Sequence, residues 1–129
     1  MAALLGLAVW TPAPAMAADV SVTSWDNVPA MTGSGKPASA EEIKRAFMVG
    51  GTRRGWTFTD AGPGKLTCTL VVRRHTLVMN LAYEDGKYSL GYKDSTNLNY
   101  DKADNTIHSN YNGWIQNLQN AIITQTSTM

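Results

Sequence analysis

The sequence contains a single cysteine, Cys68, among its 129 residues, so a small fold held together by intramolecular disulfides is excluded. Charged residues are also scarce, at 16%, and they nearly cancel to a formal net charge of +1. This balance gives no support to a dedicated nucleic-acid-binding protein. Hydrophobic residues make up 43% of the chain, which is too many for an intrinsically disordered protein. The length fits one domain with a modest core.

The N-terminus has an apolar run at residues 2–10, far shorter than the roughly 20 residues of a transmembrane helix. Helix-breaking prolines follow, and then Ala15-Met16-Ala17, a small-x-small pattern that signal peptidase recognises. We expect a signal peptide over residues 1–17 and a periplasmic or secreted mature protein. A positively charged n-region is missing, and the alternative is a disordered or weakly helical N-terminus. No cysteine lies near the cleavage point, so lipid attachment is not expected.

Residues 18–38 are rich in Pro, Gly, Ser and Thr, which is typical of a flexible linker. Within this N-terminal segment, Val20, Val22 and Trp25 either form a short edge strand or lean on the core. We expect the folded domain itself over residues 39–125, with a short tail at 126–129.

A helix is predicted to begin at Ser39, because Ser39 and Glu42 form a capping box. An apolar stripe at helical spacing follows, made of Ile43, Ala46, Phe47 and Gly50. The helix is expected to end near Arg54, with Gly55 as its left-handed cap. A glycine at position 50 facing the sheet would allow a close approach.

The period then changes to two, which predicts four strands at residues 56–59, 66–73, 77–83 and 88–92. Short connections between them, including the hairpin signal Asp85-Gly86, favour an antiparallel meander. The opposite face of this sheet is small and mostly polar, and is predicted to be either solvated or an interaction surface. Its residues are Thr67, Thr69, Val71, Val78, Asn80, Ser89 and Gly91.

A second amphipathic helix is expected near the C-terminus, with Ser109 as its N-cap. Its apolar stripe is Tyr111, Trp114, Ile115, Leu118, Ala121 and Ile122. The fold class is therefore α+β, a two-layer sandwich in the order α-β-β-β-β-α with both helices on one face of the sheet. The helices seal the apolar side of the sheet and leave no spare apolar cleft.

An ordered series of short motifs accompanies this pattern: Gly55-Trp56, Pro63-Gly64, Arg74-His75, Tyr92-Lys93-Asp94-Ser95, Ile107-His108 and Tyr111-Asn112-x-Trp114-Ile115. The series resembles a group of small exported bacterial proteins, often lipoproteins, of unknown function. The resemblance covers roughly residues 39–123. It implies export and a compact α+β domain, and it supplies no catalytic residues. The chain departs from the lipoprotein members in lacking a lipobox cysteine.

Side chains capable of catalysis are few. Cys68 is in phase with apolar strand neighbours and is expected to be a buried packing residue. His75 and His108 lack zinc-binding spacings, so we expect no metal and no cofactor, and we favour structural or surface roles for both. A Ser–His–Asp set including Asp94, Ser95 or Asp101 is the alternative, although no nucleophile-elbow motif is present.

The loop at residues 93–105 is rich in oxygen ligands but lacks the spacing of a calcium loop. We expect it to be a long solvated connection held by Leu98 and Tyr100.

Basic residues concentrate in residues 36–74, where eight basic and three acidic side chains give +5, whereas residues 75–129 carry −2. The candidate ligand-binding residues are Arg53, Arg54, Arg73, Arg74 and His75, and the guanidinium groups among them match phosphate and carboxylate. Neighbouring strand residues point to opposite faces, so only one of Arg73 and Arg74 is expected to join a given patch, and the alternative for both pairs is an ordinary solvated surface. The sequence predicts a non-catalytic exported binding module of the cell envelope, whose partner is an envelope protein or an anionic lipid or glycan. The alternatives are a small hydrolase that uses His75 or His108, and a self-associating structural protein.

Overall fold

The computed structural model describes residues 19–129, so the expected signal peptide lies outside the described residues. The elements are β1 (Asp19–Ser21), β2 (Trp25–Pro29), α1 (Ala40–Ala46), a π-helical turn η1 (Phe47–Gly51), β3 (Trp56–Asp60), β4 (Lys65–Val72), β5 (His75–Glu84), β6 (Lys87–Thr96), β7 (Thr106–His108) and α2 (Asn110–Thr126). Within the described part of the chain, neither helix has the length and apolar character needed to cross a membrane.

The main sheet has five antiparallel strands in the order β2-β6-β5-β4-β3, and β1 pairs with β7 in a separate two-stranded sheet. The predicted α+β class is confirmed, and the four predicted strands are present as the meander β3 to β6. The four-stranded sandwich is wrong in detail, because β2 adds a fifth strand along β6. A bulge interrupts β2 between Trp25 and Val28, and Asn27 has a φ of 51°. The strand therefore lacks the alternating pattern by which the others could be predicted.

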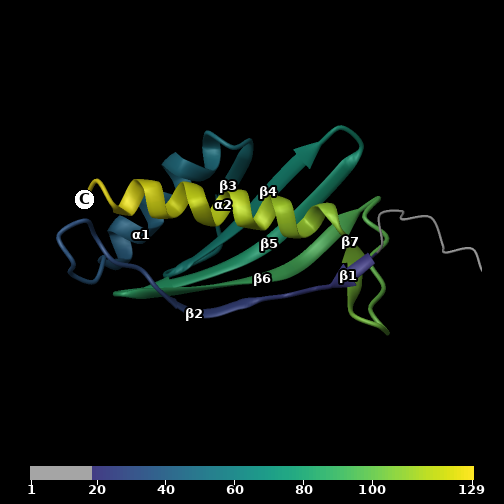
Figure 1. Cartoon of the computed structure of the whole chain (residues 1–129), viewed down its shortest axis with the longest axis horizontal. Helices are drawn as coiled ribbons and strands as arrows, with labels where there is room; N and C mark the ends of the chain where they lie inside the picture. The colour runs from purple at the N-terminus through teal and green to yellow at the C-terminus, as the bar shows by residue number, and fades with distance from the viewer. Residues whose placement is uncertain (1–18) are drawn as a thin grey trace, which may run out of the picture.

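Both helices lie on one face of the main sheet, and α2 extends along the long axis of the molecule in front of the strands (Figure 1). The strand residues that face the helices are buried, with Leu77 and Met79 at 0% exposure and Leu81 at 1%. They belong to the same core cluster as Leu118, and Trp114 packs against that cluster. The predicted burial of the sheet's apolar side beneath two amphipathic helices is confirmed.

The first helix begins as predicted, because Ser39 accepts from the Glu42 backbone and the Glu42 side chain accepts from the Ser39 backbone. It continues into η1, and Gly55 closes the segment at a φ of 92°. The predicted orientation of Gly50 is wrong. A Cβ at Gly50 would lie 2.9 Å from the backbone oxygen of Ala121, so this residue faces α2. Gly51 is the glycine that faces the sheet, where it contacts Phe58.

The start of α2 also differs from the prediction. Ser109 occupies the N-cap position, but its side chain makes no capping hydrogen bond and its backbone is already helical, with a φ of −60°. The N–H of Asn110 donates instead to Nδ1 of His108, at 3.1 Å. An imidazole therefore supplies the acceptor expected from the serine hydroxyl.

Residues 30–38, expected to be part of a flexible linker, form a narrow loop. The Thr32 N–H donates to the Lys36 carbonyl at 2.8 Å, and Met31 and Pro37 form a β-bridge. The Gly33 N–H donates to the Thr126 carbonyl at 3.2 Å. The loop is therefore attached to the C-terminal end of α2.

Candidate functional site

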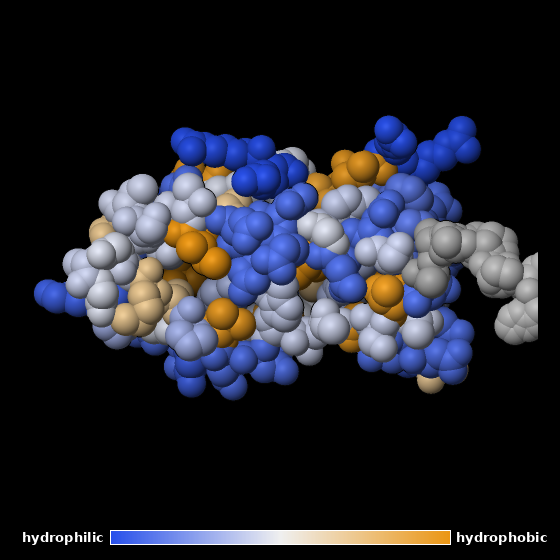
Figure 2. Space-filling model, in the orientation of Figure 1, coloured by the Kyte–Doolittle hydropathy of each residue, from blue (hydrophilic) through white to orange (hydrophobic). Residues whose placement is uncertain are grey.

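A two-residue turn, Arg73-Arg74, joins β4 to β5 and carries three of the five predicted ligand-binding residues. Arg73, Arg74 and His75 line one surface cavity of about 380 Å³ together with Asn97. Both arginines are exposed, whereas His75 is half-buried. Figure 2 shows strongly hydrophilic atoms projecting at the upper right, where Figure 1 places this turn. The predicted cluster at this strand end is therefore brought together.

Asn97 holds the turn in place through two hydrogen bonds. Its side-chain nitrogen donates to the Arg74 carbonyl at 2.8 Å, and its own carbonyl lies 2.7 Å from Nδ1 of His75. A carbonyl oxygen only accepts, so Nδ1 of His75 carries a hydrogen and donates it to Asn97. His75 therefore adds a ring of fixed orientation to the cavity.

The backbone of Arg73 is in an unfavourable conformation. Its φ is 57°, in the left-handed region that glycine and asparagine tolerate best. Residues 19–129 contain five non-glycine residues with positive φ, and the other four are asparagines: Asn27, Asn97, Asn99 and Asn105. Among the non-glycine residues of 19–129 with positive φ, Arg73 is thus the one whose residue type does not tolerate this conformation well.

The other predicted pair lies in a different cavity. Arg53 and Arg54 line a space of about 120 Å³ with Gly50 and with residues Ala121, Thr124 and Gln125 of α2. The pairing of Trp56 with Leu70 places the two arginine pairs toward the same end of the β3–β4 hairpin. The five predicted residues therefore form two separate groups, and only one of them includes a histidine.

The two histidines converge, as the hydrolase alternative requires. The ring centroids of His75 and His108 are 6.2 Å apart, and the Trp114 ring is 6.0 Å from His75. Both Nδ1 atoms already have backbone partners, Asn97 and Asn110. Among residues 19–129, no group of three or more His, Cys, Asp or Glu side chains is placed to hold a metal ion.

The proposed companions of the histidines have other partners. The Ser95 hydroxyl bonds the Tyr92 hydroxyl at 2.7 Å, and the Asp94 carboxylate accepts from the Ser95 backbone at 2.8 Å. The Asp101 carboxylate accepts from the backbone of Ala103 at 2.9 Å. Asp94 and Ser95 belong to the end of β6 and Asp101 to the connection after it, so residues 93–96 of the expected loop are strand. No carboxylate–imidazole–hydroxyl chain is formed by these side chains in the described residues.

Cys68 is fully buried, at 0% exposure, as predicted for a packing residue. Burial raises the pKa of its thiol to about 12. Since the thiolate is the reactive form, this side chain is a poor nucleophile at neutral pH.

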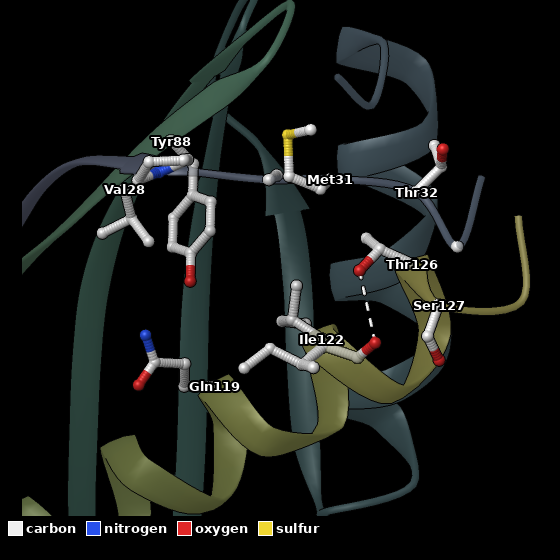
Figure 3. Close-up of a pocket in the computed structure, with 12 residues that line it drawn as sticks. Val28, Met31, Thr32, Tyr88, Gln119, Ile122, Thr126 and Ser127 are labelled. Atoms are coloured by element: carbon white, nitrogen blue, oxygen red, sulfur yellow. Dashed lines mark hydrogen bonds between the residues drawn. The ribbon is translucent and has the colours of Figure 1, made fainter. Parts of the chain in front are cut away.

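The expectation of no spare apolar cleft is wrong. A cavity of about 290 Å³, which we call the β2–α2 cavity, opens between the end of β2, the loop after it and the C-terminal part of α2. Its lining residues are Val28, Pro29, Ala30, Met31, Thr32, Gly33, Tyr88, Gln119, Ile122, Ile123, Thr126 and Ser127. Figure 3 shows the side chains of Tyr88 and Gln119 extending toward each other across it.

The sequence carried one signal for the β2–α2 cavity. Ile123 follows Ile122 directly and lies beside the core stripe of α2, and it is 56% exposed. The other wall comes from residues 28–33, whose attachment to α2 depends on hydrogen bonds that no sequence pattern predicts.

No family model matches the chain, no curated protein matches it, and no solved structure matches it. The arguments for function therefore rest on the residues themselves.

Proposed function

We propose that this protein is a non-catalytic binding module, exported to the periplasm or secreted, that binds phosphate or carboxylate groups of an envelope lipid or glycan. Arg73, Arg74 and His75 are the contact residues. The observation that carries the proposal is the left-handed backbone of Arg73. Residues held in such sparsely populated backbone conformations cluster at binding and active sites, and this supports a functional role for the turn.

The chemistry of the turn suits an anion. Each guanidinium presents a planar fork of N–H donors that pairs with two oxygens of phosphate or carboxylate. The turn is the tip of a hairpin and both arginines are exposed, and the Asn97 side chain fixes the backbone carbonyl of Arg74 on the β5 side of the turn. Pre-ordering the turn reduces the entropy lost when a ligand binds.

The envelope location is supported by the sequence at residues 1–17 and by the resemblance to exported proteins. An exported protein meets anionic lipid head groups and anionic glycans as its most abundant surfaces. The recovered mature protein is expected to begin at Asp19 or Ala18, which intact-mass measurement of protein from the periplasm or medium checks.

The decisive variant is Arg73→Asn, which places at position 73 the residue type found at the other positive-φ sites. We expect it to bind vesicles containing phosphatidylglycerol at least about threefold more weakly than the parent chain, because one charge-assisted contact is lost. We also expect it to be more stable, by roughly 1 kcal/mol, because the backbone strain is relieved.

The matched control is Arg45→Gln, which removes one positive charge from an exposed site on α1. It should change vesicle binding less than Arg73→Asn does. Equal losses in the two variants would mean that binding follows net charge alone, and the proposed site would be rejected. Phosphatidylcholine vesicles, which carry no net charge, should bind neither variant nor the parent chain.

The convergence of His75 and His108 favours a second candidate, a small hydrolase in which Nε2 of His75 activates a water. The measurement is hydrolysis of a p-nitrophenyl ester by the parent chain and by His75→Ala. Under the proposed binding function the two rates are equal within error. A rate above buffer that His75→Ala abolishes would favour the hydrolase.

A further inference from the structure

We propose that the β2–α2 cavity is a second ligand site, which takes an uncharged molecule with one short alkyl chain and a hydroxyl or amide head. The site is separate from the anion site at the β4–β5 turn and shares no residue with it. The apolar walls, the two polar groups and the lack of charged lining residues each limit the kind of molecule that the cavity is able to bind.

The walls are apolar and partly uncovered. Val28, Ala30 and Met31 form one side, and Ile122 and Ile123 of α2 form the other. Met31 is 47% exposed and Ile123 is 56% exposed, so both leave apolar surface in contact with water. Figure 2 shows orange patches, bordered by nearly neutral residues, on the part of this face where the C-terminal half of α2 lies. Burying such surface under a ligand is favourable, because apolar area is removed from water.

Two polar groups lie among these apolar walls. Tyr88 is only 3% exposed, yet it lines the β2–α2 cavity, and its hydroxyl points into it (Figure 3). The Gln119 amide approaches the same hydroxyl from α2, with its oxygen accepting from Gln116 at 3.4 Å. Burial raises the pKa of Tyr88, and the nearby Gln119 side chain opposes part of that effect. The hydroxyl therefore stays protonated at neutral pH and is able to donate to a ligand oxygen.

The lining excludes a charged head. All twelve lining residues are uncharged. An ionised carboxylate or ammonium in this cavity would lose hydration without gaining a partner of opposite charge, which is unfavourable. A neutral hydroxyl or amide, by contrast, loses little, because Tyr88 and Gln119 replace its hydrogen bonds to water.

The volume of the β2–α2 cavity limits the length of the ligand's alkyl chain. At about 290 Å³ the β2–α2 cavity is at the small end of ligand sites, which span roughly 300–1,000 Å³. One short alkyl chain fits this space, and the two chains of a phospholipid do not.

Two backbone hydrogen bonds fix the loop that forms one wall of the β2–α2 cavity. Gly33 donates its N–H to the Thr126 carbonyl at 3.2 Å, which fixes the loop to the end of α2. Ala30 donates its N–H to the Gly86 carbonyl at 2.9 Å, which fixes the other end of the loop to the β5–β6 turn. The position of this wall is therefore set by backbone hydrogen bonds of the fold, as is usual for small-molecule sites.

The experiment measures displacement of the uncharged dye N-phenyl-1-naphthylamine from the full chain at pH 8. We expect 1-decanol to displace the dye, and decanoate and decyltrimethylammonium to do so at least about tenfold more weakly, because their charges are not matched by the lining. Tyr88→Phe should weaken the binding of 1-decanol by roughly three- to tenfold, and it should weaken the binding of the dye less.

Two further variants separate the site from general surface stickiness. Ile123→Gln should weaken the binding of both the dye and 1-decanol. Because Ile123 is exposed, this change should leave the fold intact, which circular dichroism checks. Val71→Gln is the matched control, since Val71 is 63% exposed on the helix-free face of the sheet. It should change the binding of neither the dye nor 1-decanol.

The proposal is overturned if 1-decanol fails to displace the dye, if decanoate competes equally well, or if the two glutamine variants behave alike. Arg73→Asn should leave 1-decanol binding unchanged, so failure of this site and failure of the anion site are distinguishable.

Discussion

The imidazole of His108 accepts a hydrogen bond from the backbone N–H of Asn110 at 3.1 Å, and through it the last residue of β7 caps the first turn of α2. The first N–H groups of a helix have no partner within the helix. A cap supplied by the preceding strand joins the two-stranded sheet to the helix that covers the main sheet. The histidine thus has a structural role that is independent of any catalytic one.

Replacing His108 by Ala should lower the free energy of unfolding by about 1 kcal/mol, the usual cost of losing an N-terminal cap. His108→Asn should recover part of this loss, because its side-chain oxygen is also able to accept. Ser109→Ala should change stability by less than about 0.5 kcal/mol, since the Ser109 side chain makes no capping bond. Urea unfolding of the three variants measures these differences, and a larger effect at Ser109 than at His108 would contradict the assignment.

Gly50 and Gly113 should respond in opposite directions to replacement by Ala. A Cβ at Gly50 would lie 2.9 Å from the backbone oxygen of Ala121, so η1 and α2 must move apart, at a cost of about 1–3 kcal/mol. Gly113 is exposed within α2 and has nothing within 4 Å of an added Cβ. Gly113→Ala should therefore stabilise the protein by roughly 0.5–1 kcal/mol through helix propensity. Thermal unfolding of both variants provides the test, and stabilisation by Gly50→Ala would show that the two helices are free to separate.

The sequence was most informative where a repeating pattern meets a buried face. The alternation of Leu66, Cys68 and Leu70 and the helical spacing of Leu118 and Ile122 each predicted the correct face, because burial imposes the period. The strand β2 carries no such signal. It is short and bulged, and it depends on contacts made across the sequence, such as the bond from the Asn27 N–H to the Ser89 hydroxyl at 2.9 Å.

The candidate sites were predicted only in part, for a related reason. Arg73, Arg74 and His75 are neighbours in sequence, so a turn brings them together whatever the rest of the fold does. The β2–α2 cavity joins residues 28–33 to residues 119–127, and its existence depends on a gap between two packed segments. Residue types predict which side chains are buried, but they do not predict where packing is incomplete.

Alkaline pH should destabilise the protein through its buried acidic groups. Burial raises the pKa of the Cys68 thiol from 9.0 to about 12 and the pKa of the Tyr111 hydroxyl from 10.0 to about 12. In both cases the folded value lies above the unfolded one, so stability is fully present below the unfolded pKa and is lost as pH rises toward the folded pKa. Above pH 9 the unfolded chain loses protons that the folded chain retains, with a slope of up to about 1.4 kcal/mol per pH unit for each group.

The comparison of Cys68→Ala with the parent chain isolates one of these contributions. The variant is expected to be less stable at pH 7, because it leaves a small cavity in the core. Between pH 9 and pH 11 it should lose less stability than the parent chain does. Parallel stability curves over that range, measured by urea unfolding, would show that the thiol ionises equally easily in both states.

Asn97 should contribute to stability in two separable ways, through its backbone and through its side chain. Its φ is 59°, and its side-chain nitrogen donates to the Arg74 carbonyl at 2.8 Å. Asn97→Gly keeps a residue suited to positive φ but removes the side-chain bond, so it should lower the free energy of unfolding by roughly 1 kcal/mol. Asn97→Ala loses the same bond and adds left-handed strain, so its loss should be greater by about another 1 kcal/mol. Urea unfolding measures both values. Asn99→Ala serves as a control for strain alone, because Asn99 also has a positive φ, of 54°, in the same loop.

Both Asn97 variants should also weaken binding to phosphatidylglycerol vesicles, since each frees the turn that presents Arg73 and Arg74. Unchanged binding in the face of the predicted stability losses would mean that the arginines act without a fixed turn.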